Sequence, residues 1–412
     1  MAEQTKRRLA WLWVALCSFS IYLIIPIARA IQRFVSAHWG RALFGYVVIG
    51  ATVVSFCVLV LVLFSRFKVR AVSNYAWLSL VAAGYIFFTL KLWKSPEAAV
   101  HFLEYGLLGY FLFRALSFSI KDAGIFLAAF FIGSLIGTFD EIIQWVVPGR
   151  YWDLQDVGLN ALSGALLQIA LWKGVEPKFI SRKIGPKSLK KISVLFGANL
   201  ILLGLCLSNT PRVVAWLGKQ YPALAFLEKE EAMSELRYRH IDPEIGIFYS
   251  RLRLEDLKKV DEGRGEEYGR LLREWKERDY DDFLRTFTGS THPFMHEIRI
   301  HIFRRDKKYE GAEKAKSDGE KVGFLFIAYK ENLILEKYFG LTLQKSPYLW
   351  PEEKAASIAA QVDKSAFYKS PVSSGVFATL KGKTIWAVIC AILVILVIFN
   401  AWIYPRKTAG AR

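Results

Sequence analysis

Apolar residues gather in eight long runs along this chain, separated by shorter polar and charged segments. Each run is near the length that an α-helix needs to cross a hydrocarbon core of ~30 Å at ~1.5 Å per residue, although the sixth and seventh are short. The pattern therefore predicts an all-α polytopic membrane bundle of about eight transmembrane helices. The runs are Leu9–Ile27, Leu43–Phe64, Tyr75–Leu92, Ala98–Leu116, Ala123–Val146, Leu154–Leu171, Ile192–Leu207 and Thr384–Tyr404.

A long polar segment, residues 209–383, separates the last two runs and is long enough for a hydrophobic core of its own. We therefore expect three parts: a seven-helix membrane domain (1–208), an inserted domain (209–383), and a last transmembrane helix with a short tail (384–412). Nothing in the inserted domain identifies a ligand, so its default role is interaction with a partner at the membrane surface.

The inserted domain has mixed periodicity, which predicts an α+β fold. Amphipathic spacing and a proline before the last segment predict helices over Val213–Arg237, Leu254–Phe287 and Glu352–Val362. Alternation of apolar and polar residues predicts a strand over 297–303 and a hairpin formed by 321–330 and 333–339. The segment 307–321 is expected to be a loop.

Composition supports the membrane class, because 53% of the 412 residues are hydrophobic and only 22% are charged. The net charge of +18 could suggest nucleic acid, but its distribution indicates topology instead. With the N-terminus in the cytoplasm and eight spans, the cytoplasmic loops and tails hold three times as many Lys and Arg as the short outer loops. This orientation places both termini inside and residues 209–383 outside, in an inner (plasma) membrane.

The N-terminus also resembles a signal peptide, since Lys6, Arg7 and Arg8 precede an apolar run and Ala28-Arg29-Ala30 fits a cleavage site. The run is longer than a usual signal core and carries Trp11, Trp13 and Tyr22. We therefore expect the first helix to be retained, and cleavage would leave the orientation of the other spans unchanged.

The four cysteines all lie inside apolar runs, so no disulfide framework is expected in the inserted domain. Zinc-binding spacings and glycine-rich phosphate loops are absent, and no metal or cofactor is predicted. His292, His296 and His301 are close in sequence. However, His296 and His301 would lie on opposite faces of the predicted strand, which argues against a shared metal site.

Polar residues concentrate between the fifth and sixth runs, where the chain reads FDEIIQWVVPGRYWDLQDVGLNALSG (139–164). Ionisable groups at membrane depth are costly and are rarely kept without a partner or a function. Asp140 and Gln144 share one helix face, as do Asp156 and Asn160, because each pair is spaced i,i+4. We expect them to meet the start of the fourth span in an outer polar cluster of His101, Glu104, Tyr105, Asp140, Glu141, Gln144, Arg150, Asp156 and Asn160.

These residues resemble the VanZ-like membrane domain, named for a teicoplanin-resistance protein. The family pattern is a His on one span, then D-E-x-x-Q, P-G-R and D-x-x-x-N around the next hairpin. In this chain it falls on His101, then Asp140-Glu141 with Gln144, Pro148-Gly149-Arg150, and Asp156 with Asn160, within residues 95–172. The resemblance implies a cell-envelope protein with a link to glycopeptide tolerance, but it supplies no reaction.

Four roles for the cluster follow from its chemistry. It could bind a membrane lipid, a lipid-linked envelope precursor or another envelope protein, with Arg150 on an anionic oxygen and Gln144 and Asn160 as neutral donors. It could be an enzyme that uses Asp140, Glu141 or Asp156 with His101 in acid–base or metal-assisted chemistry. It could belong to a transporter, although no paired broken helices are evident. Finally, ion pairs and helix caps could simply lock a helical hairpin, with Asp153 or Asp156 as the cap. The sequence assigns no catalytic residue.

Overall fold

A computed structural model describes residues 2–148, 150–229, 232–235, 237–289, 291–373 and 382–403. The chain divides into two compact units, which we call the membrane unit (Met1–Cys206 with Ile385–Arg412) and the inserted unit (Leu207–Thr384). Both are mostly helical, and a small sheet occurs in the inserted unit. Gly149 and the basic tail residues Arg406, Lys407 and Arg412, which entered the motif and the topology argument, lie outside the described residues.

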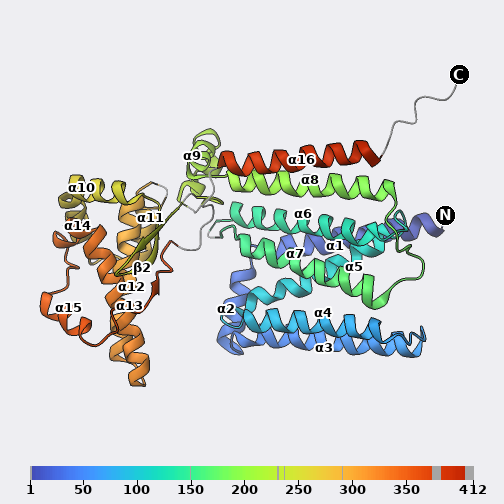
Figure 1. Cartoon of the computed structure of the whole chain (residues 1–412), viewed down its shortest axis with the longest axis horizontal. Helices are drawn as coiled ribbons and strands as arrows, with labels where there is room; N and C mark the ends of the chain where they lie inside the picture. Colours follow the sequence, from blue (N-terminus) through green and yellow to red (C-terminus); the bar gives the residue numbers. More distant parts are fainter. Residues whose placement is uncertain are drawn as a thin grey trace. The chain divides into compact units, whose positions relative to one another are not determined.

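The membrane unit consists of long helices that run side by side, joined by short turns (Figure 1). Its elements are α1 (Ala2–Ile24), α2 (Ala28–His38), α3 (Ala42–Ser65), α4 (Val72–Lys91), the 3₁₀ helix η1 (Pro96–Val100), α5 (His101–Leu116), α6 (Gly124–Val146), α7 (Leu154–Ile169), the π-helix η2 (Ala170–Val175), α8 (Pro186–Ser208) and α16 (Gly382–Ile403).

Six of these helices, among the described residues, are long and apolar enough to cross a membrane: α1, α3, α4, α6, α8 and α16. The other two predicted runs form helices of 16 residues, α5 and α7, which η1 precedes and η2 follows. The prediction of a polytopic helical membrane protein is confirmed, and the count of eight spans stays a prediction. Many large apolar side chains on α3 and α16 are exposed, as expected for helices that face lipid.

Polar side chains on α7 and α4 bind backbone carbonyls of neighbouring helices and join the centre of the bundle. Gln168 Nε2 donates to the Gly109 carbonyl at 3.0 Å, and Ser163 Oγ donates to the Phe102 carbonyl at 3.0 Å. Tyr85 Oη donates to the Ser163 carbonyl at 2.8 Å. Such interhelical hydrogen bonds stabilise membrane helix packing. They hold α4, α5 and α7 together beneath the polar cluster.

Helices α1 and α8 pack on α6 through further bonds of the same kind. Tyr22 Oη donates to the Ile136 carbonyl at 3.1 Å, and Asn199 Nδ2 donates to the Phe131 carbonyl at 3.0 Å. Ala10, Val14 and Ile21 of α1 also belong to the core that α5 and α6 form. Helix α1 is thus part of the core of the membrane unit, and its retention stays a prediction.

The inserted unit packs helices around a three-stranded sheet of order β1-β2-β3. β1 and β2 are antiparallel, with Tyr238 opposite Ser250, and β3 is parallel to β2. Gly246 begins β2 with φ of +111°, and a Cβ there would lie 2.1 Å from the Tyr368 carbonyl oxygen, so only glycine fits. The elements are α9 (Pro211–Gln220), the 3₁₀ helix η3 (Pro222–Lys229), β1 (Tyr238–Asp242), β2 (Gly246–Ser250), α10 (Leu254–Glu274), α11 (Tyr280–Thr286), α12 (Pro293–Glu313), α13 (Asp318–Tyr338), α14 (Gly340–Gln344), α15 (Glu352–Ala359) and β3 (Tyr368–Lys369).

Several predictions for this unit were wrong. The expected strand 297–303 lies in α12, and the expected hairpin 321–330 with 333–339 is the single helix α13. Most of the expected loop 307–321 also belongs to these two helices, and His296 and His301 therefore lie on a helix. The predicted helix 213–237 ends early, since β1 follows η3. The helices expected over 254–287 and 352–362 are present as α10, α11 and α15.

The reason for these errors is that the buried faces of α12 and α13 carry charged residues. Glu331 is fully buried and accepts hydrogen bonds from His301 Nδ1 at 2.6 Å, Arg304 Nε at 3.0 Å and Ser370 Oγ at 2.9 Å. Burial raises the pKa of Glu331, but His301 and its other donors outweigh burial and lower the pKa below its ordinary value. Because polar residues occupy part of the buried face of α12 and α13, the hydropathy pattern of these segments does not show the helical period.

The contacts of Asp242, at the end of β1, allow a test of what stabilises the sheet of the inserted unit. Burial raises its pKa, but bonds from Lys337 at 2.8 Å, Tyr338 Oη at 2.8 Å and two backbone amides lower it to about 2. A shift of this size corresponds to about 2 kcal/mol. Because the folded-state pKa is depressed, this stability is present at neutral pH and is lost as pH falls from about 4 through about 2.

We therefore expect Asp242→Asn to reduce the local stability of β1 and β2 by about 2 kcal/mol at pH 7. Hydrogen exchange of the strand amides in the full-length protein measures this. Glu244→Gln is the matched control, since Glu244 binds the same Lys337 from an exposed position and should change stability by less than about 0.5 kcal/mol. Equal exchange rates in wild type and Asp242→Asn would contradict the argument.

Candidate functional site

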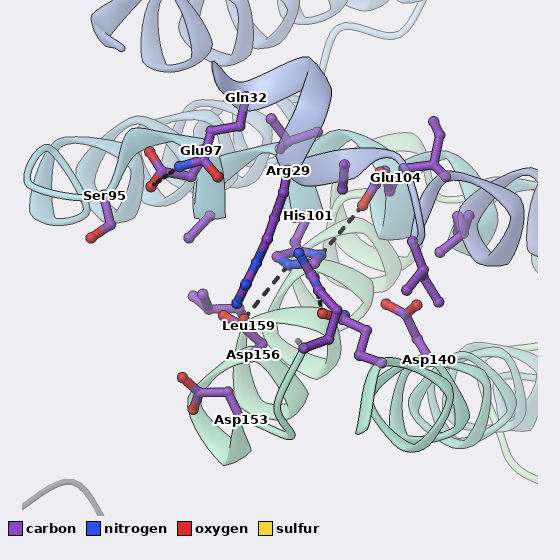
Figure 2. A pocket seen from close by; sticks show the side chains of 18 of the residues that line it. Arg29, Gln32, Ser95, Glu97, His101, Glu104, Asp140, Asp153, Asp156 and Leu159 are labelled. Carbon is purple, nitrogen blue, oxygen red and sulfur yellow. Dashed lines mark hydrogen bonds and ion pairs between the residues drawn. The ribbon is translucent and has the colours of Figure 1, made fainter. Parts of the chain in front are cut away.

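A cavity of about 500 Å³ opens at one end of the membrane unit, between the end of α1, α2, η1 and the facing ends of α5, α6 and α7. Its wall is apolar on the side of α1 and α2, where Ile21, Ile25 and Ile31 contribute. Charged groups converge on the cavity from η1, α5, α6 and α7, and Arg29 enters it from α2 (Figure 2). The cavity therefore combines a lipid-like surface with an ionisable one.

Helix boundaries explain why the polar residues meet here. α6 ends at Val146, two residues before Pro148, which cannot continue a helix hydrogen-bond pattern. α7 begins with Asp153 as its N-cap, because its side chain accepts from the Gln155 amide at 2.7 Å. The predicted cap of the sixth span is thus Asp153. The tight connection brings the end of α6 and the start of α7 to the same end of the unit.

His101, the first residue of α5, lies between two carboxylates. Its Nδ1 is 3.3 Å from Glu104 Oε2, and its Nε2 is 3.9 Å from Asp156 Oδ2 on α7. Dashed lines in Figure 2 mark both contacts. An imidazole between two carboxylates can hold a proton, pass one on, or bind a cation.

Glu141 and Gln144 are buried on the inner face of α6. Gln144 Nε2 donates to Glu141 Oε1 at 2.7 Å, while the Asp153 backbone amide donates to Glu141 Oε2 at 3.2 Å. Arg150 donates to the Gln144 side-chain oxygen. The Gln144 amide is therefore used within the protein, and it orients Glu141 and Arg150 instead of donating into the cavity.

Asp140 faces the cavity one residue earlier on α6. Its side chain is only 2% exposed and accepts from Tyr105 Oη at 2.9 Å through Oδ2. Its other oxygen, Oδ1, has no hydrogen-bond partner among the described residues. Asp140 and Tyr105 thus join α6 to α5, and one carboxylate oxygen of this cavity-lining residue remains without a hydrogen-bond donor among the described residues.

Asn160 is placed differently from the other predicted residues. It is 1% exposed, and its Nδ2 donates to the Gly137 carbonyl at 3.4 Å across the contact between α7 and α6. It does not line the cavity. The structure therefore brings eight of the nine predicted residues to the cavity or directly behind it, and it places Asn160 at the helix contact below.

Sequence reasoning missed the contribution of α2. Arg29 extends from α2 across the cavity toward Asp156 (Figure 2), and it has no hydrogen bond or ion pair within the described part of the chain. Gln32 on the same helix donates to Glu97 of η1 at 2.8 Å, and Arg41 binds the same carboxylate at 2.5 Å. The strongly amphipathic pattern of residues 28–38, between the first two predicted spans, is the sequence signal for this helix.

The close contact between α6 and α7 offers a test. A Cβ added to Gly137 would lie 2.8 Å from Asn160 Cβ and 3.1 Å from Tyr105 Cε1, whereas one added to Gly133 would meet only Leu112 at 3.5 Å. We expect Gly137→Ala to destabilise the membrane unit by about 1–3 kcal/mol through overpacking. Gly133→Ala, one helical turn away, should leave the melting temperature in detergent nearly unchanged. Equal melting temperatures for the two variants would contradict this packing.

The family comparison agrees with this geometry. A VanZ/LLP1 family model matches residues 53–176, a range that includes α4, η1, α5, α6 and α7 and most of the polar wall. No curated protein and no solved structure matches the chain. The resemblance drawn from His101 and the D-E-x-x-Q, P-G-R and D-x-x-x-N pattern is thus confirmed: residues 53–176 of this multi-pass membrane protein match the VanZ/LLP1 family model.

Proposed function

We propose that the cavity binds the anionic headgroup of an envelope lipid or lipid-linked precursor, and that the protein acts in the cell envelope by holding or presenting that molecule. The observation that carries this proposal is Arg29. A guanidinium without a partner in the described chain extends into a cavity that Ile21, Ile25 and Ile31 also line. Such a site suits a molecule with a charged head and a hydrocarbon tail.

The charges and apolar groups are arranged in the order that an amphiphile needs. Arg29 and Arg150 both line the cavity, and a guanidinium fork matches the oxygens of a phosphate or carboxylate. Ile21 and Ile24 of α1, with Ile25 directly after it, line the same cavity and suit the first carbons of a lipid chain. Charge-assisted hydrogen bonds of this kind contribute about 1.5–3 kcal/mol each.

The proposed orientation of the protein in the membrane follows from the distribution of its basic residues. Lys and Arg are enriched in the loops expected to be cytoplasmic, which would put the cavity and residues 209–383 on the extracytoplasmic side and both termini inside. A ligand would then reach the cavity from the outer leaflet. The inserted unit would serve as an interaction domain for an envelope partner.

A second candidate function is enzymatic and uses the same cavity. His101 with Glu104 on one side and Asp156 on the other is an arrangement suited to general acid–base work on a lipid-linked headgroup. The two functions differ in the fate of the bound molecule. Recovery of the bound lipid unchanged after long incubation supports binding, and recovery of a cleaved or rearranged headgroup supports the enzyme.

Arg29→Gln tests the binding proposal. We expect it to weaken binding of a short-chain polyprenyl phosphate to the detergent-solubilised protein about tenfold or more, because one charge-assisted contact is lost. Arg33→Gln is the matched control, since Arg33 lies on the same helix, is exposed and does not line the cavity. Titration by intrinsic tryptophan fluorescence or native mass spectrometry measures both affinities. Equal binding by Arg29→Gln and Arg33→Gln would reject the proposal.

The link to glycopeptide tolerance is tested in cells. At equal membrane abundance, we expect cells that carry Arg29→Gln to lose any teicoplanin tolerance that the wild-type protein confers, and Arg33→Gln to retain it. Growth across a teicoplanin dilution series, beside immunoblots of the membrane fraction, measures this. If the wild-type protein confers no tolerance, glycopeptide tolerance is not part of its function. The binding experiment with Arg29→Gln then tests the lipid-binding proposal alone.

A further inference from the structure

His101, Glu141 and Asp156 form a group with the geometry of metal ligands. Their nearest ligand atoms, one from each residue, all lie within 4.8 Å of one another. A divalent metal ion holds imidazole nitrogen and carboxylate oxygen at about 2.0–2.2 Å, so two of its ligands are at most about 4.4 Å apart. The 3.9 Å between His101 Nε2 and Asp156 Oδ2 already meets this limit. For the most widely separated pair of ligand atoms, side-chain movements of a few tenths of an ångström are enough to meet it.

The surroundings of His101 fit a ligand. The imidazole turns Nε2 toward Asp156, while Nδ1 lies 3.3 Å from Glu104 Oε2. Metal-binding histidines almost always direct their second ring nitrogen at a carboxylate or carbonyl, which fixes the ring and leaves the first nitrogen free to coordinate. Glu104 has that position here, one helical turn from His101.

Glu141 is held in a similar way. It is fully buried, and each of its oxygens accepts one hydrogen bond, from Gln144 Nε2 at 2.7 Å and from the Asp153 amide at 3.2 Å. Each carboxylate oxygen keeps a second lone pair for a cation. These two bonds fix the direction of the carboxylate before any ion binds.

Asp140 provides an independent observation. It is 2% exposed, lines the same cavity, and leaves Oδ1 without a hydrogen-bond partner among the described residues. Figure 2 shows this carboxylate among the side chains that line the cavity. A buried carboxylate oxygen without a partner is unfavourable, and a bound cation or its coordinated water would satisfy it.

The balance of charge also calls for a cation. Three carboxylates, those of Glu104, Glu141 and Asp156, gather around one imidazole, and Asp140 lines the same cavity. The nearby guanidinium of Arg150 is bonded to Gln144, and Arg29 reaches the edge of the group from α2. Like charges repel strongly where water is scarce, so an ion of charge +2 would stabilise this arrangement.

We propose that His101, Glu141 and Asp156 bind a divalent first-row transition-metal ion of the Zn²⁺ or Mn²⁺ class. One nitrogen and two carboxylate ligands suit these ions, whereas Mg²⁺ and Ca²⁺ prefer oxygen ligands alone. The ion would face the cavity that Asp140 also lines, where an open coordination position can take a phosphate or carboxylate oxygen. That last step rests on the proposed lipid binding, but the metal site itself does not.

The test uses tag-free, full-length protein in detergent, stripped with a chelator and dialysed against Zn²⁺ or Mn²⁺ alone. Elemental analysis after buffer exchange is expected to give about one ion per wild-type chain. His101→Gln and Asp156→Asn should each weaken binding at least tenfold. Glu97→Gln, which alters a carboxylate of the same cavity outside the ligand group, should bind as the wild type does.

Glu104→Gln separates loss of metal binding from loss of folding, because it keeps all three ligands and removes only the carboxylate that orients His101. Loss of such a partner typically weakens metal affinity 10- to 100-fold, and we expect that range with an unchanged melting temperature of the metal-free protein. A wild-type chain that retains no stoichiometric metal, or a His101→Gln chain that retains as much as wild type, would overturn the proposal. Arg29→Gln should keep the ion and lose the lipid, so failure of lipid binding with the ion still bound counts against the proposed function alone.

Discussion

The burial of ionisable side chains between apolar helices is the constraint on which this structure depends. Glu141 is fully buried and Asp140 nearly so, at the ends of helices long enough for a membrane. A charge in that environment is tolerated only with hydrogen-bond donors and opposite charges close by. The turn at Pro148, the cap at Asp153 and the small residue Gly137 all bring such partners within reach.

A structural clasp would satisfy part of this constraint but leaves some features unexplained. Gln144 and the Asp153 amide satisfy Glu141, and Tyr105 satisfies one oxygen of Asp140, so these contacts do lock α5, α6 and α7 together. The second oxygen of Asp140 and the guanidinium of Arg29 lack partners in the described chain, and both face one cavity. Because these two groups do not help to hold the helices together and both belong to residues that line one cavity, they are the basis for a role in binding.

Much of the membrane unit could be predicted from the sequence because apolar runs and i,i+4 spacing report directly on spans and helix faces. The spacing of Asp140 with Gln144, and the position of His101 at the start of a span, were enough to group the site. Spacing could not tell which donors are used inside the protein, as Gln144 and Asn160 are. It also could not tell that α2, an amphipathic helix between two spans, carries Arg29 into the cavity.

The inserted unit was harder to predict, since its core mixes apolar and charged residues. In α12 and α13, buried His301 and Glu331 occupy positions that a hydropathy pattern assigns to a solvent face, so two helices were predicted as strands and a loop. Burial along α12 and α13 follows the helical period, but this period is visible only when the buried, paired polar residues are counted together with the apolar ones.

The most direct test of the account is the headgroup of the lipid that the wild-type protein retains through prolonged detergent exchange, identified by mass spectrometry. The account predicts about one tightly held phosphate-bearing lipid per chain, enriched well above its share of the surrounding membrane. Retention of lipids only in proportion to the bulk membrane would contradict it, and the polar cluster would then be a clasp between helices.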